Sequence, residues 1–253
     1  RGQFAPAQII QCIEAAVNAE SFDEGMAVER ARFAECMSDP QREALIHIFF
    51  AERAANKIPG LPKDVPLLDI NKGSVIGAGT MGGGIAMCFA NAGIPVRVHD
   101  NDPENLVRGM KVIEGNYART VSKGRLTQEE MDKRMSLIIP TENFDDLGDG
   151  DIVVEAVYEN LDLKKEIFAR LDKVMKQGAL LATNTSGLDV DAIAGMTDRP
   201  EFVCGMHFFS PANVMRLLEV VRGKDSSPVV LGTAMALGKR LGKVSVMAGN
   251  CPG

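Results

Sequence analysis

The sequence predicts an α/β fold: a doubly wound, mostly parallel sheet with a helical hairpin insertion, preceded by a short all-helical segment. From residue 67 onward, short apolar segments alternate with helical ones, which is the pattern of a parallel sheet covered by helices on both faces. Before residue 59, apolar residues recur instead at the three- and four-residue spacing of amphipathic helices.

Three helices are expected within residues 1–58. They span residues 5–20, 21–37 and 38–56. Ser21 begins the second of them as the first residue of a capping box with Glu24. A proline-rich stretch follows the third helix, so residues 59–70 are interpreted as a linker.

Residues 71–253 contain six candidate strands, which are short apolar segments bounded by turn residues. They are residues 72–76, 95–99, 152–155, 180–183, 202–207 and 216–221. The stretch from Asp102 to Met135 is polar and helical in pattern, with a turn at residues 122–124. Because this stretch is longer than a plain crossover, we expect a projecting helical hairpin there.

Composition excludes several classes of partner. Of the 253 residues, 45% are apolar and 25% charged, and the formal net charge of -6 comes without a basic stripe, so nucleic acid is not an expected partner. No segment approaches the roughly 18 consecutive apolar residues of a membrane span. The five cysteines lie far apart without metal-ligand spacing, as in the reduced thiols of an intracellular protein, so no metal is expected.

Both ends of the sequence have the character of chain interiors. The first ten residues lack the charged, apolar and small-residue regions of a secretory signal. The last three, Cys251 to Gly253, directly follow an apolar run. We therefore expect the sequence to be truncated at both ends.

The most specific local pattern lies between the first candidate strand and the helix after it. Residues 74–82 read SVIGAGTMG, in which Gly77, Gly79 and Gly82 have the GxGxxG spacing. The first glycine permits a tight turn, the second lets the backbone approach a pyrophosphate, and the third allows close packing of helix on strand. The pattern predicts a dinucleotide site. A glycine turn that only packs the helix remains the alternative.

Asp100 ends the second candidate strand, about 20 residues after the first glycine, where an acidic residue binds the adenosine ribose. A carboxylate at this position disfavours a 2′-phosphate, so NAD is expected rather than NADP. The alternative is that Asp100 is only a turn residue and Asn101 caps the next helix.

Three histidines are available as the base that a hydride-transfer reaction requires. His47 lies on the third helix and His99 in the second strand, and both are interpreted as structural. His207 ends an apolar strand, at the edge where open α/β sheets bind ligands. Glu219 lies in the next apolar strand, where an unpaired carboxylate is costly, so its expected partner is either His207 or a cation such as Arg216.

Four stretches, in order, resemble the NAD-binding domain of L-3-hydroxyacyl-CoA dehydrogenases. They read VIGAGTMGGGIA from Val75, VVEAVYENL from Val153, TNTSGL from Thr183, and HFFSP from His207. This domain occurs in multifunctional fatty-acid β-oxidation enzymes of the peroxisomal bifunctional type and of the bacterial fatty-oxidation complex α-subunit type. The resemblance implies a Rossmann fold and NAD-dependent oxidation of (S)-3-hydroxyacyl-CoA to 3-oxoacyl-CoA.

The resemblance also implies residue roles. His207 is the expected catalytic base and Glu219 its orienting carboxylate; Ser186 binds the 3-oxygen of the substrate and Asn184 helps to hold nicotinamide and substrate. The expected cofactor contacts are Gly77, Gly79, Thr80, Met81, Gly82, Asp100, Ala156, Glu159, Lys164 and Asn184. Two plainer interpretations stay open: residues 184–186 as a simple turn, and Lys164 as a solvated helix charge.

Residues 1–58 resemble the closing helices and linker of the enoyl-CoA hydratase module that precedes the dehydrogenase in these enzymes. The hydratase's catalytic segments are missing, so hydratase activity is expected of the parent protein and not of this chain. The family's C-terminal helical domain, which closes the cleft and makes subunit contacts, is missing too. We therefore expect NAD binding with slow turnover.

The expected partner is an acyl-CoA substrate, and the expected location is the bacterial cytoplasm or the peroxisome. Two other functions stay open from the sequence. One is a dehydrogenase of a free 3-hydroxy acid, which shares the glycine turn but typically uses a lysine. The other is an NAD-binding fragment without catalytic activity.

Overall fold

The computed structural model describes residues 2–55, 58, 60–62 and 64–251. The chain divides into two compact units, Arg1–Lys57 and Ile58–Gly253. Asn56, the expected end of the third helix, lies outside the described residues, as do Pro252 and Gly253.

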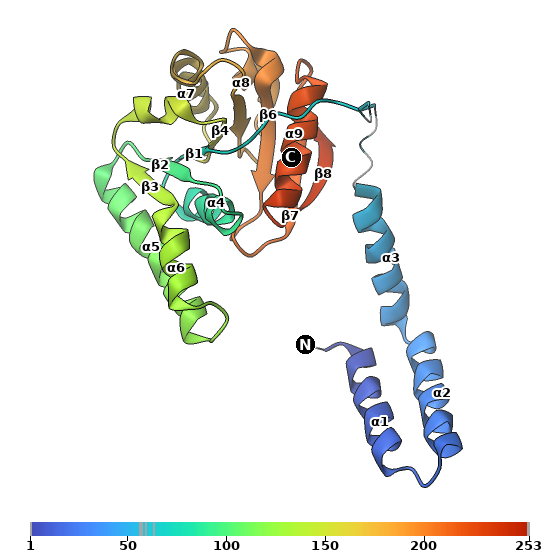
Figure 1. Ribbon diagram of the computed structural model, residues 1–253. Helices are drawn as coiled ribbons and strands as arrows, with labels where there is room; N and C mark the ends of the chain where they lie inside the picture. The colour runs from blue at the N-terminus through green and yellow to red at the C-terminus, as the bar shows by residue number, and fades with distance from the viewer. Residues whose placement is uncertain (1, 56–57, 59, 63, 252–253) are drawn as a thin grey trace. The chain divides into compact units, whose positions relative to one another are not determined.

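The described part of the first unit contains the three predicted helices, α1 (Phe4–Asn18), α2 (Phe22–Ser38) and α3 (Pro40–Ala55) (Figure 1). Ser21 caps α2, because its hydroxyl accepts the Glu24 N–H at 3.3 Å. The Glu24 carboxylate accepts the N–H of Glu20 at 3.0 Å, one residue before the position that a capping box requires. Gln8 is the one buried residue among these helices.

The second unit is built on an eight-stranded sheet with the order β3-β2-β1-β4-β5-β6-β7-β8. The strands are β1 (Gly73–Ile76), β2 (Val96–His99), β3 (Ile138–Thr141), β4 (Ile152–Glu155), β5 (Leu180–Thr183), β6 (Val203–Phe208), β7 (Leu217–Arg222) and β8 (Val244–Gly249). All neighbouring strands are parallel except the antiparallel pair β6 and β7. The predicted fold class is confirmed.

The six predicted strands are present, with ends shifted by no more than one residue, but two edge strands were not predicted. β3 contains Pro140, and its burial pattern of two exposed residues between two buried ones is neither alternating nor continuous. Proline, which has no N–H to donate, is tolerated in an edge strand. At the other edge, the sequence indicates β8 only as an apolar run.

Two helical layers cover the sheet, because alternate residues of each central strand point to opposite faces. Val75 and Val154 pack in one apolar cluster with α4 (Thr80–Asn91) and α9 (Pro228–Arg240). Ile76 and Val153 pack in the other with α7 (Leu161–Val174), α8 (Val190–Ala194) and the 3-10 helix η1 (Phe144–Asp149). A second 3-10 turn, η2 (Pro200–Phe202), leads into β6.

The predicted helical hairpin is confirmed as α5 (Pro103–Ser122) and α6 (Gln128–Ser136), which lie side by side in Figure 1. Asp102 caps α5 by accepting the N–H of Glu104, so the alternative that Asn101 caps this helix is wrong. Thr127 and Glu130 form a full capping box at the start of α6.

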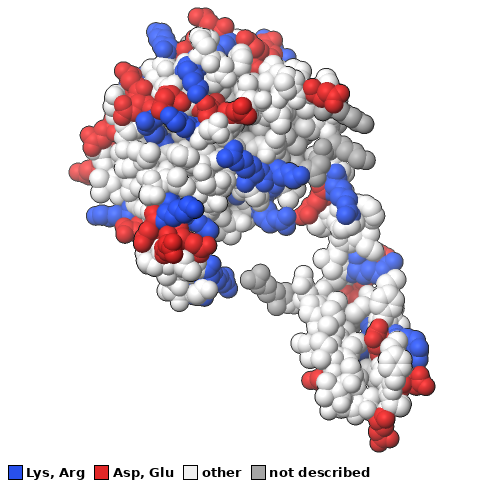
Figure 2. All heavy atoms as spheres, viewed as in Figure 1, with Lys and Arg blue, Asp and Glu red and all other residues white. Residues whose placement is uncertain are grey.

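Acidic and basic side chains gather in separate small groups on the face of the second unit that Figure 2 shows. In the part of the chain that the structure describes, no helix has both the length and the apolar character needed to cross a membrane. No group of three or more His, Cys, Asp or Glu side chains suited to a metal ion occurs among the same residues.

The strand order reverses at β1, which lies between β2 and β4. The segments that leave β1 and β4 at their carboxyl ends are therefore connected on opposite sides of the sheet. Open α/β sheets bind ligands in the crevice at this point.

Candidate active site

A cavity of about 930 Å³ lies beside the segments that follow β1, β2 and β4, and its volume lies within the usual range for a ligand site. Its lining includes six of the predicted cofactor residues: Gly77, Gly79, Thr80, Met81, Asp100 and Ala156. It also reaches Pro211 and Asn213, in the loop after β6. Four other predicted cofactor residues are not among its lining residues: Gly82, Glu159, Lys164 and Asn184.

The glycine turn has the geometry of a pyrophosphate cradle. Gly77 has a φ of 98°, and a Cβ at this position would lie 2.7 Å from the carbonyl oxygen of Ala156. A Cβ at Gly79 would meet no atom within 4 Å, so this glycine faces open space at the N-terminus of α4. Exposed backbone at a helix N-terminus is suited to an anion, so these residues fit the diphosphate of NAD.

Asp100 follows β2 and braces the same turn. Its Oδ2 accepts the N–H of Ala78 at 2.8 Å, and its Oδ1 accepts the N–H of Asp102 at 3.0 Å. The carboxylate therefore holds backbone and lines the cavity at once, so the predicted role in ribose binding and the alternative role as a turn residue are geometrically compatible.

Asp100→Asn tests this carboxylate, since the amide oxygen can still accept the Ala78 N–H while the charge is lost. We expect the dissociation constant of NADH to rise about tenfold, the worth of one charge-assisted hydrogen bond, and that of NADPH to change less. Titration of cofactor fluorescence measures both. Equal weakening of NADH and NADPH would show that Asp100 only braces the turn.

His207 and Glu219 are joined across the antiparallel pair β6 and β7, whose register sets the two residues opposite each other. The distance between His207 Nδ1 and Glu219 Oε2 is 2.8 Å, so the predicted pairing with His207 is confirmed. The side chains are 17% and 36% exposed, and the imidazole packs against the ring of Phe209. A carboxylate on Nδ1 fixes the proton there and leaves Nε2 as the basic nitrogen.

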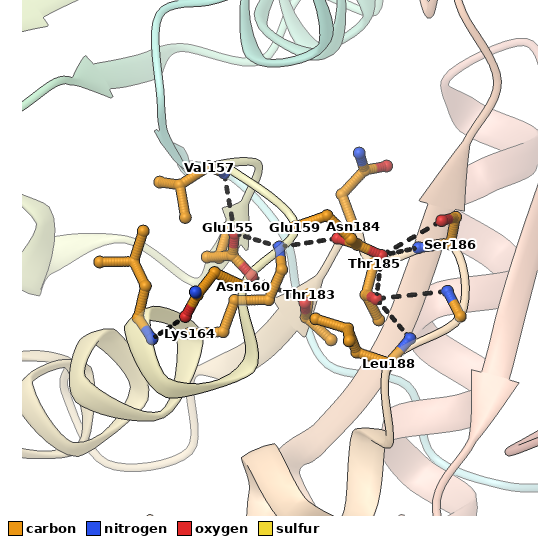
Figure 3. Close-up of polar contacts among 12 residues, drawn as sticks. Glu155, Val157, Glu159, Asn160, Lys164, Thr183, Asn184, Thr185, Ser186 and Leu188 are labelled. Carbon is orange, nitrogen blue, oxygen red and sulfur yellow. Dashed lines mark hydrogen bonds and ion pairs between the residues drawn. The ribbon is translucent and has the colours of Figure 1, made fainter. Parts of the chain in front are cut away.

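Asn184 and Ser186 lie on the turn after β5, which Figure 3 shows beside the loop after β4. Asn184 Oδ1 accepts the N–H of Phe208 at 2.8 Å, so this side chain connects the turn to the residue after His207. Ser186 donates from both its N–H and its hydroxyl to Glu159 Oε1, at 2.8 and 3.1 Å. Hydrogen bonds therefore hold this turn to the end of β6 on one side and to the loop after β4 on the other.

The pKa of Glu159 reflects opposing effects. Partial burial raises it, whereas hydrogen bonds from Thr185 and Ser186 and the charge of Lys164 lower it, and the net pKa lies below the ordinary value. Glu159 is therefore an anion at neutral pH, and it is suited to accept hydrogen bonds.

Lys164 is 1% exposed, so its interpretation as a solvated helix charge is wrong. Its ammonium lies 2.7 Å from Glu155 Oε1 and 3.5 Å from Glu159 Oε2. Of the predicted cofactor residues it is the one whose charge is enclosed by protein.

Three polar residues near the site were not predicted. Glu155 and Thr183 end β4 and β5 and are fully buried, where the Thr183 hydroxyl donates to Glu155 at 2.7 Å. Lys243 donates from Nζ to the carbonyl oxygens of Ala212 and Met215 and so fixes the loop after His207. The one sequence sign was that Glu155 ends a wholly apolar strand, where a charge needs a partner.

The family model described as "3-hydroxyacyl-CoA dehydrogenase, NAD binding domain" matches residues 72–251. The peroxisomal bifunctional enzyme of Danio rerio is 43% identical over all of this chain, which spans 35% of that protein. The fatty acid oxidation complex subunit alpha of a Psychrobacter strain is 39% identical over 98% of this chain and 34% of its own length. The chain thus spans about a third of the length of these relatives.

Solved structures with a similar fold point to the same family. The 3-hydroxybutyryl-CoA dehydrogenase of Escherichia coli has a TM-score of 0.71 and 38% identity, over 72% of this chain and 39% of that one. The dehydrogenase part of multifunctional enzyme 1 from C. elegans has a TM-score of 0.70 and 34% identity, over 80% and 48%. The chain therefore belongs to the family of 3-hydroxyacyl-CoA dehydrogenase NAD-binding domains.

Proposed function

We propose that this chain supplies the NAD site and the catalytic base for oxidation of an (S)-3-hydroxyacyl-CoA to the 3-oxoacyl-CoA in fatty-acid β-oxidation. The observation that carries the proposal is the hydrogen bond between His207 and Glu219 at the end of β6. Pro211 and Asn213, in the loop after His207, line the same cavity as the glycine turn, whereas His207, Glu219 and Ser186 are not among its lining residues. This supports a base that lies next to the dinucleotide cradle.

The residues that hold NAD are the glycine turn for the diphosphate and Asp100 for the adenosine ribose, with Ala156 beside them. When bound, NAD supplies a nicotinamide ring that accepts the hydride from C3 of the substrate. Asn184 lies on the turn after β5, and Glu159 accepts hydrogen bonds from Ser186 of the same turn. The Lys164 ammonium lies 3.5 Å from Glu159 and acts on this turn through it.

His207 takes the proton of the substrate's 3-hydroxyl at Nε2, because Nδ1 faces Glu219. The Glu219 carboxylate stabilises the imidazolium as it forms. A base positioned in this way accelerates proton transfer by about 10²- to 10⁴-fold. Since only neutral imidazole accepts the proton, oxidation is slower wherever His207 is already charged.

Asn184 and Ser186 orient the reacting oxygen. The Oδ1 of Asn184 is taken by the N–H of Phe208, which leaves its amide hydrogens for substrate or nicotinamide. Ser186 is proposed to bind the 3-oxygen through its hydroxyl, while its N–H is held by Glu159 Oε1. Groups fixed in this way contribute by orientation and by stabilising charge on oxygen.

The test is a single turnover, with protein in excess over NADH and acetoacetyl-CoA as oxidant, followed by the absorbance of NADH. We expect oxidation with acetoacetyl-CoA at least tenfold faster than with free acetoacetate, because remote binding energy of the CoA part positions the reacting carbonyl. Faster reaction with acetoacetate would favour a free-acid dehydrogenase. Binding of NADH without any oxidation would favour the inactive NAD-binding fragment.

Residues 1–58 are proposed to be the tail of a hydratase-like module, in support of which the match to the bifunctional enzymes extends over the helical segment as well. The relatives' names include peroxisomal enzymes and bacterial fatty-oxidation subunits, which supports a peroxisomal or bacterial cytoplasmic location. An acyl-CoA is the proposed partner.

A further inference from the structure

We propose that Glu155 is a positioning residue of this site, which acts through Lys164 and Glu159 on the turn that carries Ser186. The proposal rests on the proposed function, because it relies on the role given there to Ser186. Figure 3 shows the contacts, which run from the end of β4 through α7 to the turn after β5.

Glu155 is a fully buried carboxylate with three donors around it. Its Oε1 accepts the N–H of Val157 at 2.8 Å and the ammonium of Lys164 at 2.7 Å, and its Oε2 accepts the hydroxyl of Thr183 at 2.7 Å. A buried ion pair contributes little more to stability than apolar residues of the same volume. A role in the neighbouring site therefore accounts better for the Glu155–Lys164 pair than stability does.

Lys164 divides its charge between two carboxylates of different exposure. Glu155 is 0% exposed and Glu159 43% exposed, and the ammonium lies closer to the buried one. Because Glu155 balances most of this charge, Glu159 is left free to direct its other oxygen elsewhere.

Glu159 uses that oxygen, Oε1, to hold the turn after β5, which carries Ser186. It accepts the hydroxyl of Thr185 at 2.6 Å as well as the N–H and hydroxyl of Ser186. The Thr185 hydroxyl in turn accepts the N–H of Leu188 at 2.9 Å, which closes the turn. Without the charge of Glu155, Lys164 draws the Glu159 carboxylate toward itself, and Ser186 loses its fixed position.

Glu155→Gln removes the charge and keeps an amide that can accept the Val157 N–H. We expect the single-turnover rate with acetoacetyl-CoA and NADH to fall about tenfold, the effect of one misplaced charge-assisted bond. The positioning role predicts that this effect shrinks below about twofold in a Ser186→Ala background. Glu155 acts on the rate through the Ser186 hydroxyl, and that hydroxyl is absent there. An equal effect in both backgrounds would overturn the proposal.

Asp172→Asn is the matched structural control. Asp172 lies on α7, the helix that also carries Lys164, and it forms a part-buried ion pair with Arg199. We expect it to lower the melting temperature by an amount comparable to that for Glu155→Gln and to change the rate by less than about twofold. If Glu155→Gln changes the rate no more than this control does, Glu155 is structural only.

Hydrogen exchange separates this inference from the proposed function, because it needs no turnover. Glu155→Gln should speed amide exchange in residues 184–188 about tenfold, and Asp172→Asn should not. Unchanged exchange there would overturn the positioning path even in an active protein. If Glu155→Gln does not fold, Glu155→Asp keeps the charge but withdraws it from the Lys164 ammonium by one methylene group, so faster exchange at 184–188 than in Asp172→Asn is still expected. Wild-type exchange there would sink the proposal.

Discussion

His207→Gln should lower the single-turnover rate of NADH oxidation by acetoacetyl-CoA about a thousandfold, within the range of a lost general acid or base. In this direction the imidazolium gives its proton to the forming 3-hydroxyl, so the variant lacks the donor. Glutamine is similar in size and polar, and its side chain can still hydrogen-bond Glu219, so the protein should fold and bind NADH normally. Stopped-flow absorbance measures the rate, and cofactor fluorescence measures the binding.

Two further variants show whether the effect belongs to the base itself. His47→Gln changes an exposed histidine of α3 and should leave the rate unchanged. Glu219→Gln keeps a hydrogen-bond acceptor beside Nδ1 but removes its charge, so a fall of about 10- to 100-fold is expected, the worth of a hydrogen bond to a charged group. A His207→Gln rate within tenfold of wild type would exclude His207 as the base.

The parts of the site that the sequence predicted are those whose chemistry is local. The glycine turn can be recognised because three glycines, a strand and a helix are adjacent in the chain. His207 and Glu219 are adjacent in space through a direct antiparallel connection, so the register of one hairpin is enough to pair them. Both features depend on few contacts between residues that lie far apart in the sequence.

Lys164 and Glu159 were predicted as cofactor contacts, but their contacts with Glu155 and Ser186 escaped prediction because they depend on burial. Lys164 has the sequence context of a solvated helix charge, and only the packing of α7 on the sheet encloses it beside Glu155. The same holds for Glu159, which faces the Ser186 turn because β4 and β5 are parallel neighbours whose carboxyl ends meet. The edge strand β3 was missed because Pro140 and two exposed residues hide its pattern.

Gly82→Ala should destabilise the fold most among substitutions in the glycine turn. A Cβ there would lie 1.8 Å from the carbonyl oxygen of Gly77 and 2.9 Å from its carbon, both backbone atoms of a tight turn. Overpacking of this kind costs about 3 kcal/mol or more, because α4 has to move away from β1. For a unit of this size the melting temperature should fall by roughly 6–12 °C, and NADH binding should be lost with the shape of the turn.

Gly79→Ala is the matched control, because its Cβ would meet no atom of the protein within 4 Å and its φ of −72° suits alanine. The melting temperature should therefore stay within about 2 °C of wild type. The new methyl group would occupy the space where the backbone approaches the diphosphate, so the dissociation constant of NADH should rise about 30-fold or more. Calorimetry and fluorescence titration measure the two effects separately. Wild-type affinity in Gly79→Ala would mean that the diphosphate does not lie against this turn, and the assignment of the cavity to NAD would fail with it.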